Sequence, residues 1–422
     1  MSKKVWSLLA VLMIATLIIS ACAPAAAPAP TQAPAQPAAP AEPTKAAEPA
    51  KPFTIGMILV GPQNDKGWSQ ANYDAGLYVG EKLGAKMIVI DKVNTADRPG
   101  TTVDQVAADM IAQGAQMVFM TSDDMKDGAL LAAEKFPNVP MVFTSGDTAW
   151  KDGKDYHSAL TNLANIMGKM EYGKMMAGCA AALTSEKGSI GYLGPLINDE
   201  TRRLTASVYL GAKYCWETYR QKPANSLKFE VKWIGFWFNI PGVTLDPTQV
   251  ANEFFDTGAD VLVSGIDTTE AIVVAGQRAD KGDKVWAIPY DYKSACDQSP
   301  KICLGVPYFN WGPAYVKAVK AAMDGKFSAF FEWNGPDWKN INDPDTSAIG
   351  FENGPALSAD NATTLAKFIA GLGDGSINLW KGPMNYQDKS VFLKDGEVAT
   401  DLQIWYMPQL LEGMLGASQS TK

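Results

Sequence analysis

The chain has 422 residues, of which 47% are hydrophobic and 19% are charged. A chain of this length can bury a large core, and it suggests about two domains. The net charge of −8 at pH 7 argues against a nucleic-acid partner and, more weakly, against a highly anionic ligand.

The first 22 residues are typical of an export signal. Two lysines precede an apolar run from Val5 to Ile19, which is short for a membrane span. The segment ends in ISAC, which resembles a bacterial lipobox with Cys22 as its cysteine. We expect cleavage before Cys22 and lipidation of its thiol; an ordinary signal peptide and a retained membrane span are the alternatives.

Residues 23–52 consist almost wholly of Ala, Pro, Thr, Gln, Glu and Lys. Such a segment cannot form a core, and its frequent prolines prevent a helix. A proline-rich tether extends about 3 Å per residue, so this one can hold the following body up to ~90 Å from the lipid. The sequence therefore predicts a disordered tether ahead of a folded body.

The folded body opens with an apolar run, Ile55–Val60, that predicts a buried strand, and a helix is expected to begin at Trp68. Ligands of open parallel sheets bind outside the carboxyl ends of the strands, where the connecting loop places Asp65, Trp68 and Ser69. A carboxylate accepts hydrogen bonds from hydroxyls, and an indole stacks on a flat ring. The stretch suggests a site for a small neutral molecule with planar and polyol parts. The alternatives are that Trp68 caps the core and Asp65 caps the helix.

Two series of alternating strands and helices follow, and these indicate βαβ units on parallel sheets. The first series is expected to contain strands Lys86–Ile90, Gln116–Met120 and Pro140–Phe143 and helices Thr101–Gln113 and Lys126–Lys135. The second is expected to contain helices Asn165–Leu183, Asp199–Tyr219, Thr248–Thr257 and Thr269–Ala279 and strands Ser189–Leu193, Lys228–Phe238, Asp260–Ser264 and Lys284–Pro289. The body is therefore predicted to be two α/β lobes rather than one wide sheet.

The rest of the chain has a looser pattern. We expect a strand at Leu304–Phe309, helices at Pro313–Met323, Ser358–Leu372 and Asp401–Gly413, an aromatic loop at Phe330–Ile341 and a hairpin at Asp395-Gly396.

Polar residues gather where several predicted strands end. Ser122 and Asp123 follow one strand and Ser145 follows another, on the same rim of the sheet as the first loop. Asp267, in the loop after the strand at residues 260–264, is a further candidate. Asp123 and Asp124 could mimic a glycosidase pair, but adjacent acids at strand ends more often face solvent or cap helices.

Trp237 and Asp291 are the candidates from the second lobe. Alternation along the strand predicted at residues 228–238 turns Trp237 away from its flanking phenylalanines, toward either a cleft or an inter-lobe core. Asp291 lies between two tyrosines at the carboxyl end of a strand. Two aromatic faces would hold a base, and a carboxylate on a diol would orient a sugar.

Four cysteines lie in the body of this exported chain, where disulfides are permitted. Cys296 and Cys303 bracket the short sequence DQSPKI, and Cys179 and Cys215 lie on two predicted helices that flank one strand. Each pair forms either a disulfide or two buried thiols. The spacing does not suit a metal, and the single histidine, His157, cannot build a usual zinc site.

The sequence contains no glycine-rich phosphate loop of the Walker type, no histidine-based triad and no HExxH motif. We therefore expect a binding protein rather than an enzyme, with no cofactor and no metal.

Several segments resemble the basic membrane protein (BMP) family of lipoproteins, which are substrate-binding proteins of ABC importers and include a purine nucleoside receptor. These segments are DKGWSQ in the first loop, YGKMMAGCAAAL with IGYLGPL, WFNIPGVTLDPTQVANEFFDTGADVL, the turn YDY, FNWGPAYVKAVKAAMDGKF and the closing KGPMNYQDKSVFLKDGEVATDLQIWYMPQLLEGMLG. The resemblance extends from about residue 51 to residue 416. It implies the type I periplasmic-binding-protein fold, in which two lobes joined by several crossing strands close on a ligand.

The resemblance also implies roles for individual residues. Trp68 stands where the family has an aromatic residue, usually Phe, that stacks on a nucleobase, and Asp65 stands at an acidic position of the same loop. Trp237 lies near the opposing aromatic, and Asp291 matches an acid that binds ribose hydroxyls. The candidate ligand-binding residues are therefore Asp65, Trp68, Ser69, Ser122, Asp123, Ser145, Trp237, Asp267, Asp291, Asn310 and Trp311.

Two departures from the family pattern involve these residues. Ser69 replaces the usual Asn, and Asn310 and Trp311 fall where some members carry a lysine and others carry this Asn-Trp pair, so that a cation is missing. A ligand that is related to a nucleoside without being one is therefore an open alternative.

We expect a lipid-anchored, monomeric receptor on the outer face of the cell membrane that passes a purine nucleoside or related small molecule to an ABC permease. The first lobe is expected to comprise residues 53–160 and about 291–330, and the second residues 161–290 and part of 331–416. The alternatives are a sugar receptor of the same fold, a nucleoside-processing enzyme, and a surface adhesin or sensor.

Overall fold

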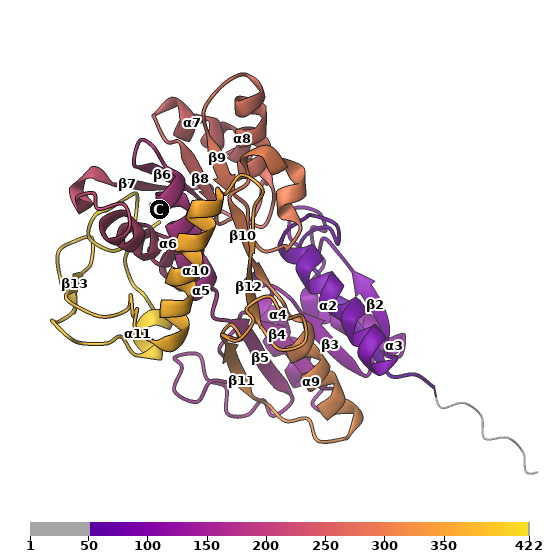
Figure 1. Ribbon diagram of the computed structural model, residues 1–422. Helices are drawn as coiled ribbons and strands as arrows, with labels where there is room; N and C mark the ends of the chain where they lie inside the picture. The colour runs from indigo at the N-terminus through magenta and orange to yellow at the C-terminus, as the bar shows by residue number, and fades with distance from the viewer. Residues whose placement is uncertain (1–50, 421–422) are drawn as a thin grey trace, which may run out of the picture. The chain divides into compact units, whose positions relative to one another are not determined.

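The computed structural model describes residues 51–420 (Figure 1). The predicted signal segment, Cys22 and most of the tether lie outside the described residues. Within the described part, no helix combines the length and the apolar character that a membrane span needs.

The first of two main sheets has six parallel strands in the order β11-β5-β4-β3-β1-β2 (Figure 1). Its strands are β1 (Thr54–Ile58), β2 (Lys86–Ile90), β3 (Met117–Met120), β4 (Met141–Thr144), β5 (Leu163–Gly168) and β11 (Phe331–Asn334). The helices whose buried residues share its core are α2 (Trp68–Leu83), α3 (Val103–Ala112), α4 (Lys126–Lys135) and α9 (Gly312–Met323). The central strands β3 and β4 are buried at every position, as parallel strands covered on both faces must be.

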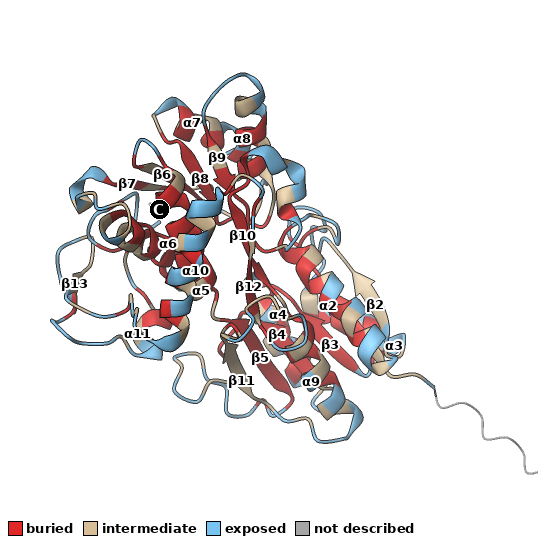
Figure 2. Cartoon of the chain, in the orientation of Figure 1, coloured by how far each residue is buried: buried red, intermediate tan, exposed pale blue. Residues whose placement is uncertain are grey.

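The second main sheet has five parallel strands in the order β15-β7-β6-β8-β9. Its strands are β6 (Ser189–Gly194), β7 (Lys228–Trp233), β8 (Val261–Ser264), β9 (Trp286–Ile288) and β15 (Met414–Leu415). The helices that accompany it are α5 (Met170–Thr184), α6 (Asp199–Thr218), α7 (Pro247–Asp256), α8 (Glu270–Asp280), α10 (Ala359–Asp374) and α11 (Asp401–Trp405). Figure 2 shows the inner strands of both sheets as buried, the edge strands β2 and β11 as mainly intermediate, and the outward faces of the helices as exposed. The predicted fold class, α/β with two parallel sheets flanked by helices, is confirmed.

An antiparallel pair, β10 (Gly305–Phe309) and β12 (Ile349–Asn353), connects the two cores. Phe309 and Ile349 belong to the core of the first sheet, whereas Leu304 and Phe351 belong to the core of the second. Two of the segments that cross between the sheets therefore form a hydrogen-bonded ladder, and a third crossing runs directly from β5 into α5.

Three predicted features differ from the structure. Residues 165–168, predicted as the start of a long helix, belong to β5, which pairs with β4 and β11, and the helix begins only at Met170. The first sheet therefore includes residues 163–168, which were expected in the second lobe, and residues 331–334, which lie beyond the expected end of the first lobe. The final helix ends at Trp405 instead of Gly413, and the chain turns back into β15.

The hairpin in the closing segment is short. β13 (Met384–Asn385) pairs with β14 (Val391–Leu393), and a further bridge between Lys381 and Val398 encloses the turn at Gly396. Gly396 has φ +74°, a left-handed conformation that glycine adopts without strain.

Helices α5 and α6 pack with their backbones in contact. A Cβ atom at Gly178 would lie 1.9 Å from the Val208 carbonyl oxygen, and one at Gly211 would lie 2.0 Å from that of Met175. Only glycine allows this approach. A disulfide joins Cys179 on α5 to Cys215 on α6, and a second joins Cys296 to Cys303, so both pairs considered from the sequence are bonded in the structure.

A disulfide stabilises mainly by restricting the unfolded chain, more so for a longer loop. Replacing both Cys179 and Cys215 by Ala opens a loop with a sequence separation of 36 and should lower the free energy of unfolding by about 4 kcal/mol. The matched change at Cys296 and Cys303, with a separation of 7, should cost about 2 kcal/mol. Urea denaturation measures both values, and equal losses from the two pairs would contradict this ordering.

Candidate functional site

A cavity of about 390 Å³ lies between the carboxyl ends of the two sheets. Its lining comes from both sheets and is partly aromatic, partly acidic and partly hydroxylic. The lining residues are Trp68, Ser122, Asp123, Ser145, Tyr192, Glu200, Thr201, Leu204, Trp237, Gly265, Asp267 and Tyr290.

Trp68 and Trp237 both line this one cavity, and each is less than a tenth exposed. The indole N–H of Trp68 donates to the Thr121 carbonyl, and its ring meets those of Phe309 and Trp311 edge-on at 5.3 Å. Trp237 lies beyond the end of β7 at Trp233, so the strand alternation used to place it from the sequence does not apply. It reaches the cavity from a loop, and its buried indole N–H has no hydrogen-bond partner among the described residues.

The two lobes meet by backbone contact beside these tryptophans. The Trp68 N–H donates to the Asp267 carbonyl at 3.3 Å, and the Asp267 N–H donates to the Trp237 carbonyl at 2.9 Å. A Cβ atom at Gly67 would lie 1.7 Å from the same Asp267 carbonyl oxygen, which leaves room only for glycine. Gly67 therefore sets how closely the two tryptophans approach.

Asp65 and Ser69 organise the first loop and are absent from the cavity lining. The Asp65 carboxylate accepts hydrogen bonds from the N–H groups of Gly67, Ser69 and Gln70, which satisfies donors at the start of α2. The Ser69 hydroxyl accepts from the Gly61 N–H at 3.0 Å. Burial raises the pKa of Asp65 to about 6, against the opposing effect of these hydrogen bonds.

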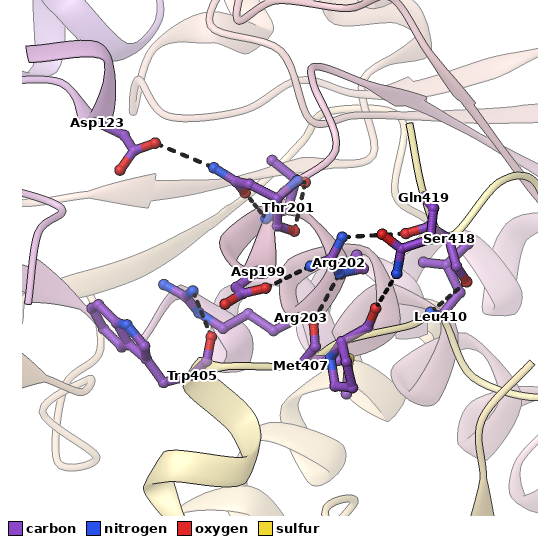
Figure 3. A network of polar contacts seen from close by, with 12 residues as sticks. Asp123, Asp199, Thr201, Arg202, Arg203, Trp405, Met407, Leu410, Ser418 and Gln419 are labelled. Atoms are coloured by element: carbon purple, nitrogen blue, oxygen red, sulfur yellow. Dashed lines mark hydrogen bonds and ion pairs between the residues drawn. The ribbon is translucent and has the colours of Figure 1, made fainter. Parts of the chain in front are cut away.

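Three carboxyl groups line the cavity: Asp123, Glu200 and Asp267. Burial raises the pKa of each one, most strongly that of Asp267, to which the nearby carboxyl of Asp291 adds. The pKa of Glu200 reaches about 7. Asp123 accepts a hydrogen bond from the Asn198 side chain at 3.3 Å, which links the first sheet to the start of α6 (Figure 3).

Asp291 lies behind the cavity wall. Its side chain is fully buried, both carboxyl oxygens are without a hydrogen-bond partner among the described residues, and its backbone has φ +70°. Burial raises the pKa of Asp291 well above its ordinary value, and the nearby Lys174 opposes the rise. Lys174 donates to the Ser264 carbonyl at 2.8 Å and lies 3.0 Å from the centre of the Tyr290 ring, which lines the cavity. An acid in a strained backbone conformation with unused acceptors is typical of a functional position.

Asn310 and Trp311 support the site from outside the cavity. The Asn310 side chain donates to two carbonyls, those of Pro344 and Ser347. The Trp311 ring stacks on Phe309 at 4.4 Å, and it is one of the two rings against which Trp68 packs. At these two positions the structure places packing and loop contacts rather than cavity lining.

The predicted residues that reach the cavity are Trp68, Ser122, Asp123, Ser145, Trp237 and Asp267. The lining residues that the sequence analysis did not select are Tyr192, Glu200, Thr201, Leu204, Gly265 and Tyr290. Glu200 and Thr201 could have been found, because they begin the helix after β6 just as Trp68 begins the helix after β1. Tyr192 and Leu204 carry no such signal, since either would also suit a core.

The raised pKa of Glu200 makes stability depend on pH. The folded state holds this proton more tightly than the unfolded state, so stability is greatest below the ordinary value of 4.5 and falls as the pH rises to about 7. The fall should reach about 3 kcal/mol. Glu200→Gln removes this titrating group. In urea denaturation, the free energy of unfolding of the variant relative to that of the natural protein should therefore rise between about pH 5 and pH 8.

Glu217→Gln, on the same helix in a half-exposed ion pair with Lys213, is the matched control and should follow the natural protein. A Glu200→Gln variant whose stability runs parallel to the natural protein at both pH values would refute the assignment.

Comparison with known sequences identifies relatives of the whole body. The model of the Bmp family, described as ABC transporter substrate-binding protein PnrA-like, matches residues 53–334. A purine-binding protein of Brucella abortus is 28% identical over 348 residues, which cover 82% of this chain and 88% of that protein. A putative ABC transporter glucose-binding protein of Haloferax volcanii is 24% identical over 225 residues, which cover 53% of this chain and 50% of that protein.

Solved structures share the fold at low sequence identity. A solute-binding protein of an ABC transporter system from Aeropyrum pernix matches with a TM-score of 0.61 and 13% identity, over 78% of this chain and 93% of that one. One from Conexibacter woesei matches with a TM-score of 0.56 and 16% identity, over 77% and 98%. These neighbours have the type I periplasmic-binding-protein fold, and the family model covers more than half of the chain, so this protein belongs to the Bmp family of PnrA-like ABC transporter substrate-binding proteins.

Proposed function

We propose that this protein is a lipid-anchored, monomeric receptor that binds a purine nucleoside or a related purine compound between its two lobes and delivers it to an ABC permease. The observation that carries the proposal is the placement of Trp68 and Trp237, from opposite lobes, in one cavity with the carboxyl group of Asp267. Aromatic rings stack on bases with a gain of about 1–3 kcal/mol per base. Carboxyl oxygens accept from the N–H groups of a base or the hydroxyls of a sugar.

The charges of the cavity favour a ligand without phosphate. Its lining includes three acids and no Lys, Arg or His. A phosphate would lose its hydration and meet only carboxyl groups and neutral donors. A base or a nucleoside therefore fits this lining, whereas a nucleotide does not.

The named relatives support the two leading ligand classes. The Brucella abortus relative is named for purine binding, and the more distant Haloferax volcanii relative is named as a putative glucose receptor. A sugar receptor is therefore the second candidate, since acids beside tryptophans also suit a sugar ring.

Calorimetric titration of the body with adenine, adenosine, guanosine, AMP and glucose tests the proposal. We expect binding of at least one base or nucleoside and none of AMP. Binding of glucose alone would indicate a sugar receptor, and slow cleavage of adenosine during incubation would indicate an enzyme.

Loss of the stacking ring should weaken binding. Trp68→Ala should cost about 1–3 kcal/mol, or roughly five- to 150-fold in the dissociation constant, whereas Trp68→Phe keeps a flat ring and should lose less. Trp338→Ala, which removes a ring packed against Tyr172 away from the cavity, is the control for general loss of stability. Equal affinity of Trp68→Ala and the natural protein would count against stacking.

Membrane attachment is tested separately, because Cys22 lies outside the described residues. The full chain should partition with membranes or detergent when it is expressed in a bacterium that processes lipoproteins, and Cys22→Ser should abolish this. Retention of the variant in the membrane fraction would favour an uncleaved span over a lipid anchor.

A further inference from the structure

A second cavity adjoins the ligand cavity and is larger, at about 720 Å³. We call it the side chamber. It shares three lining residues with the ligand cavity, namely Asp123, Ser145 and Glu200. On its other sides it is lined by the loop after β4, by the start of α6 and by Trp405 and Tyr406 from the closing segment. Asp123, Ser145 and Glu200 therefore belong to the wall that the two cavities have in common.

The side chamber carries an excess of negative charge. Its cations are already paired: Lys126 with Asp155, and Arg203 with Glu171 at 2.7 Å. Among its remaining acids, Asp199 is bound to Arg202. Asp123, Asp147 and Glu200 have no ion pair in the described part of the chain, so up to three uncompensated carboxyl groups face one space.

Ser145 lies in the wall between the two cavities and has unused hydrogen-bonding capacity. Its hydroxyl is buried without a partner among the described residues, and the residue is only 5% exposed. Its backbone has φ +77°, a conformation that is costly for a residue other than glycine. The backbone is held there by a bond of 3.1 Å from the Ser145 N–H to the Ile166 carbonyl. A buried hydroxyl kept in this way, with cavities on both sides, points to a polar ligand group.

Aromatic rings complete the side chamber. The Tyr406 hydroxyl donates to the Asp147 carboxylate, which keeps that acid at the chamber wall, and the Trp150 ring stacks parallel to Tyr406 at 6.0 Å. The Arg203 guanidinium lies 4.3 Å from the Trp405 ring centre (Figure 3). The Lys154 ammonium group lies 4.2 Å from the centre of the Tyr406 ring, so both chamber rings already carry a cation and the carboxylates are the groups left to bind an added ammonium group.

We propose that the side chamber receives a cationic, amine-bearing substituent of the ligand, so that the protein prefers purine compounds that carry an alkylamine over those that carry a neutral chain. The inference rests on the proposed function, because it takes the ring of the ligand to lie between Trp68 and Trp237. It extends that function by assigning a charge and a place to the part of the ligand outside the stacked ring.

Paired probes test the charge alone. We would titrate the natural protein at about pH 8 with adenine, with adenine carrying a 4-aminobutyl group and with adenine carrying a butyl group, each chain attached at N6 or at N9. In at least one of these positions the amine should bind about tenfold more tightly than the butyl compound, and salt should reduce this advantage.

Asp147→Asn should lower the ratio of amine to butyl affinity about threefold or more, because it removes one charge while keeping an acceptor for Tyr406. Asp152→Asn removes an exposed acid from the same loop without touching the chamber and should leave the ratio unchanged. Thermal denaturation confirms that both variants are folded.

The outcomes separate this inference from the function on which it rests. If adenine binds but the amine and butyl compounds bind equally well, or neither of them binds, the side-chamber assignment is wrong. The proposed binding of purines would still stand. An unchanged ratio in Asp147→Asn would also overturn it. Failure of every purine compound to bind would overturn the proposed function, and the inference would fall with it.

Discussion

The geometry of the site depends on one close approach between two backbone segments. Gly67 ends the first loop against the Asp267 carbonyl, where a side chain has no room, and the next N–H donates to the same oxygen. Asp65 holds the loop in shape by accepting three backbone N–H groups. Trp68 is the next residue, so backbone atoms set the distance of its indole from the opposite lobe. A loop whose role is to place an aromatic ring is best fixed by its backbone, since side-chain contacts alone leave more freedom.

The acidic residues of the site differ in whether they line the cavity. Asp123, Glu200 and Asp267 line the cavity, where a ligand can replace the water that a carboxyl group would otherwise bind. Asp291 is buried outside the cavity lining with Lys174 and the Tyr290 hydroxyl nearby, and neither of its oxygens has a hydrogen bond of good geometry among the described residues. An unsatisfied buried acid costs stability in the structure as it stands. A hydrogen-bond donor from a ligand, or from Tyr290 after a small movement, would remove that cost. Ligand binding would then stabilise the structure through Asp291 as well.

Much of the fold followed from sequence patterns, and the exceptions have physical reasons. Apolar runs followed by amphipathic helices located most strands of the two sheets but not β5, β11 or β15, because strands buried on both faces are apolar along their whole length. Residues 165–168 were wrongly predicted as helix, because what makes them part of a strand is their pairing with β4 and β11. Pairing partners distant in sequence leave no local trace.

The site was predictable to a similar degree. Loop residues such as Trp68 and Asp267 could be placed because strand ends of a parallel sheet share one edge. Asn310 and Trp311 were predicted to bind the ligand. In the structure the Asn310 side chain donates to two loop carbonyls, and the Trp311 ring stacks on Phe309. Trp237 reaches the cavity from an irregular loop, so its direction could not be derived from strand alternation. Side-chain direction outside regular elements is decided by tertiary contacts that a sequence does not display.

The closing segment lies beyond the matched part of the family model and forms one side of the side chamber. The family model ends at residue 334, whereas Trp405 and Tyr406, which form one side of the side chamber, lie beyond it. Tyr406 contacts the Asp147 loop of the first lobe, and the Trp405 carbonyl accepts from Arg203 of the second. Tyr406 and Trp405 thus tie the closing segment to both lobes at the wall of the side chamber, so a substitution in this segment would alter the chamber without touching Trp68 or Trp237.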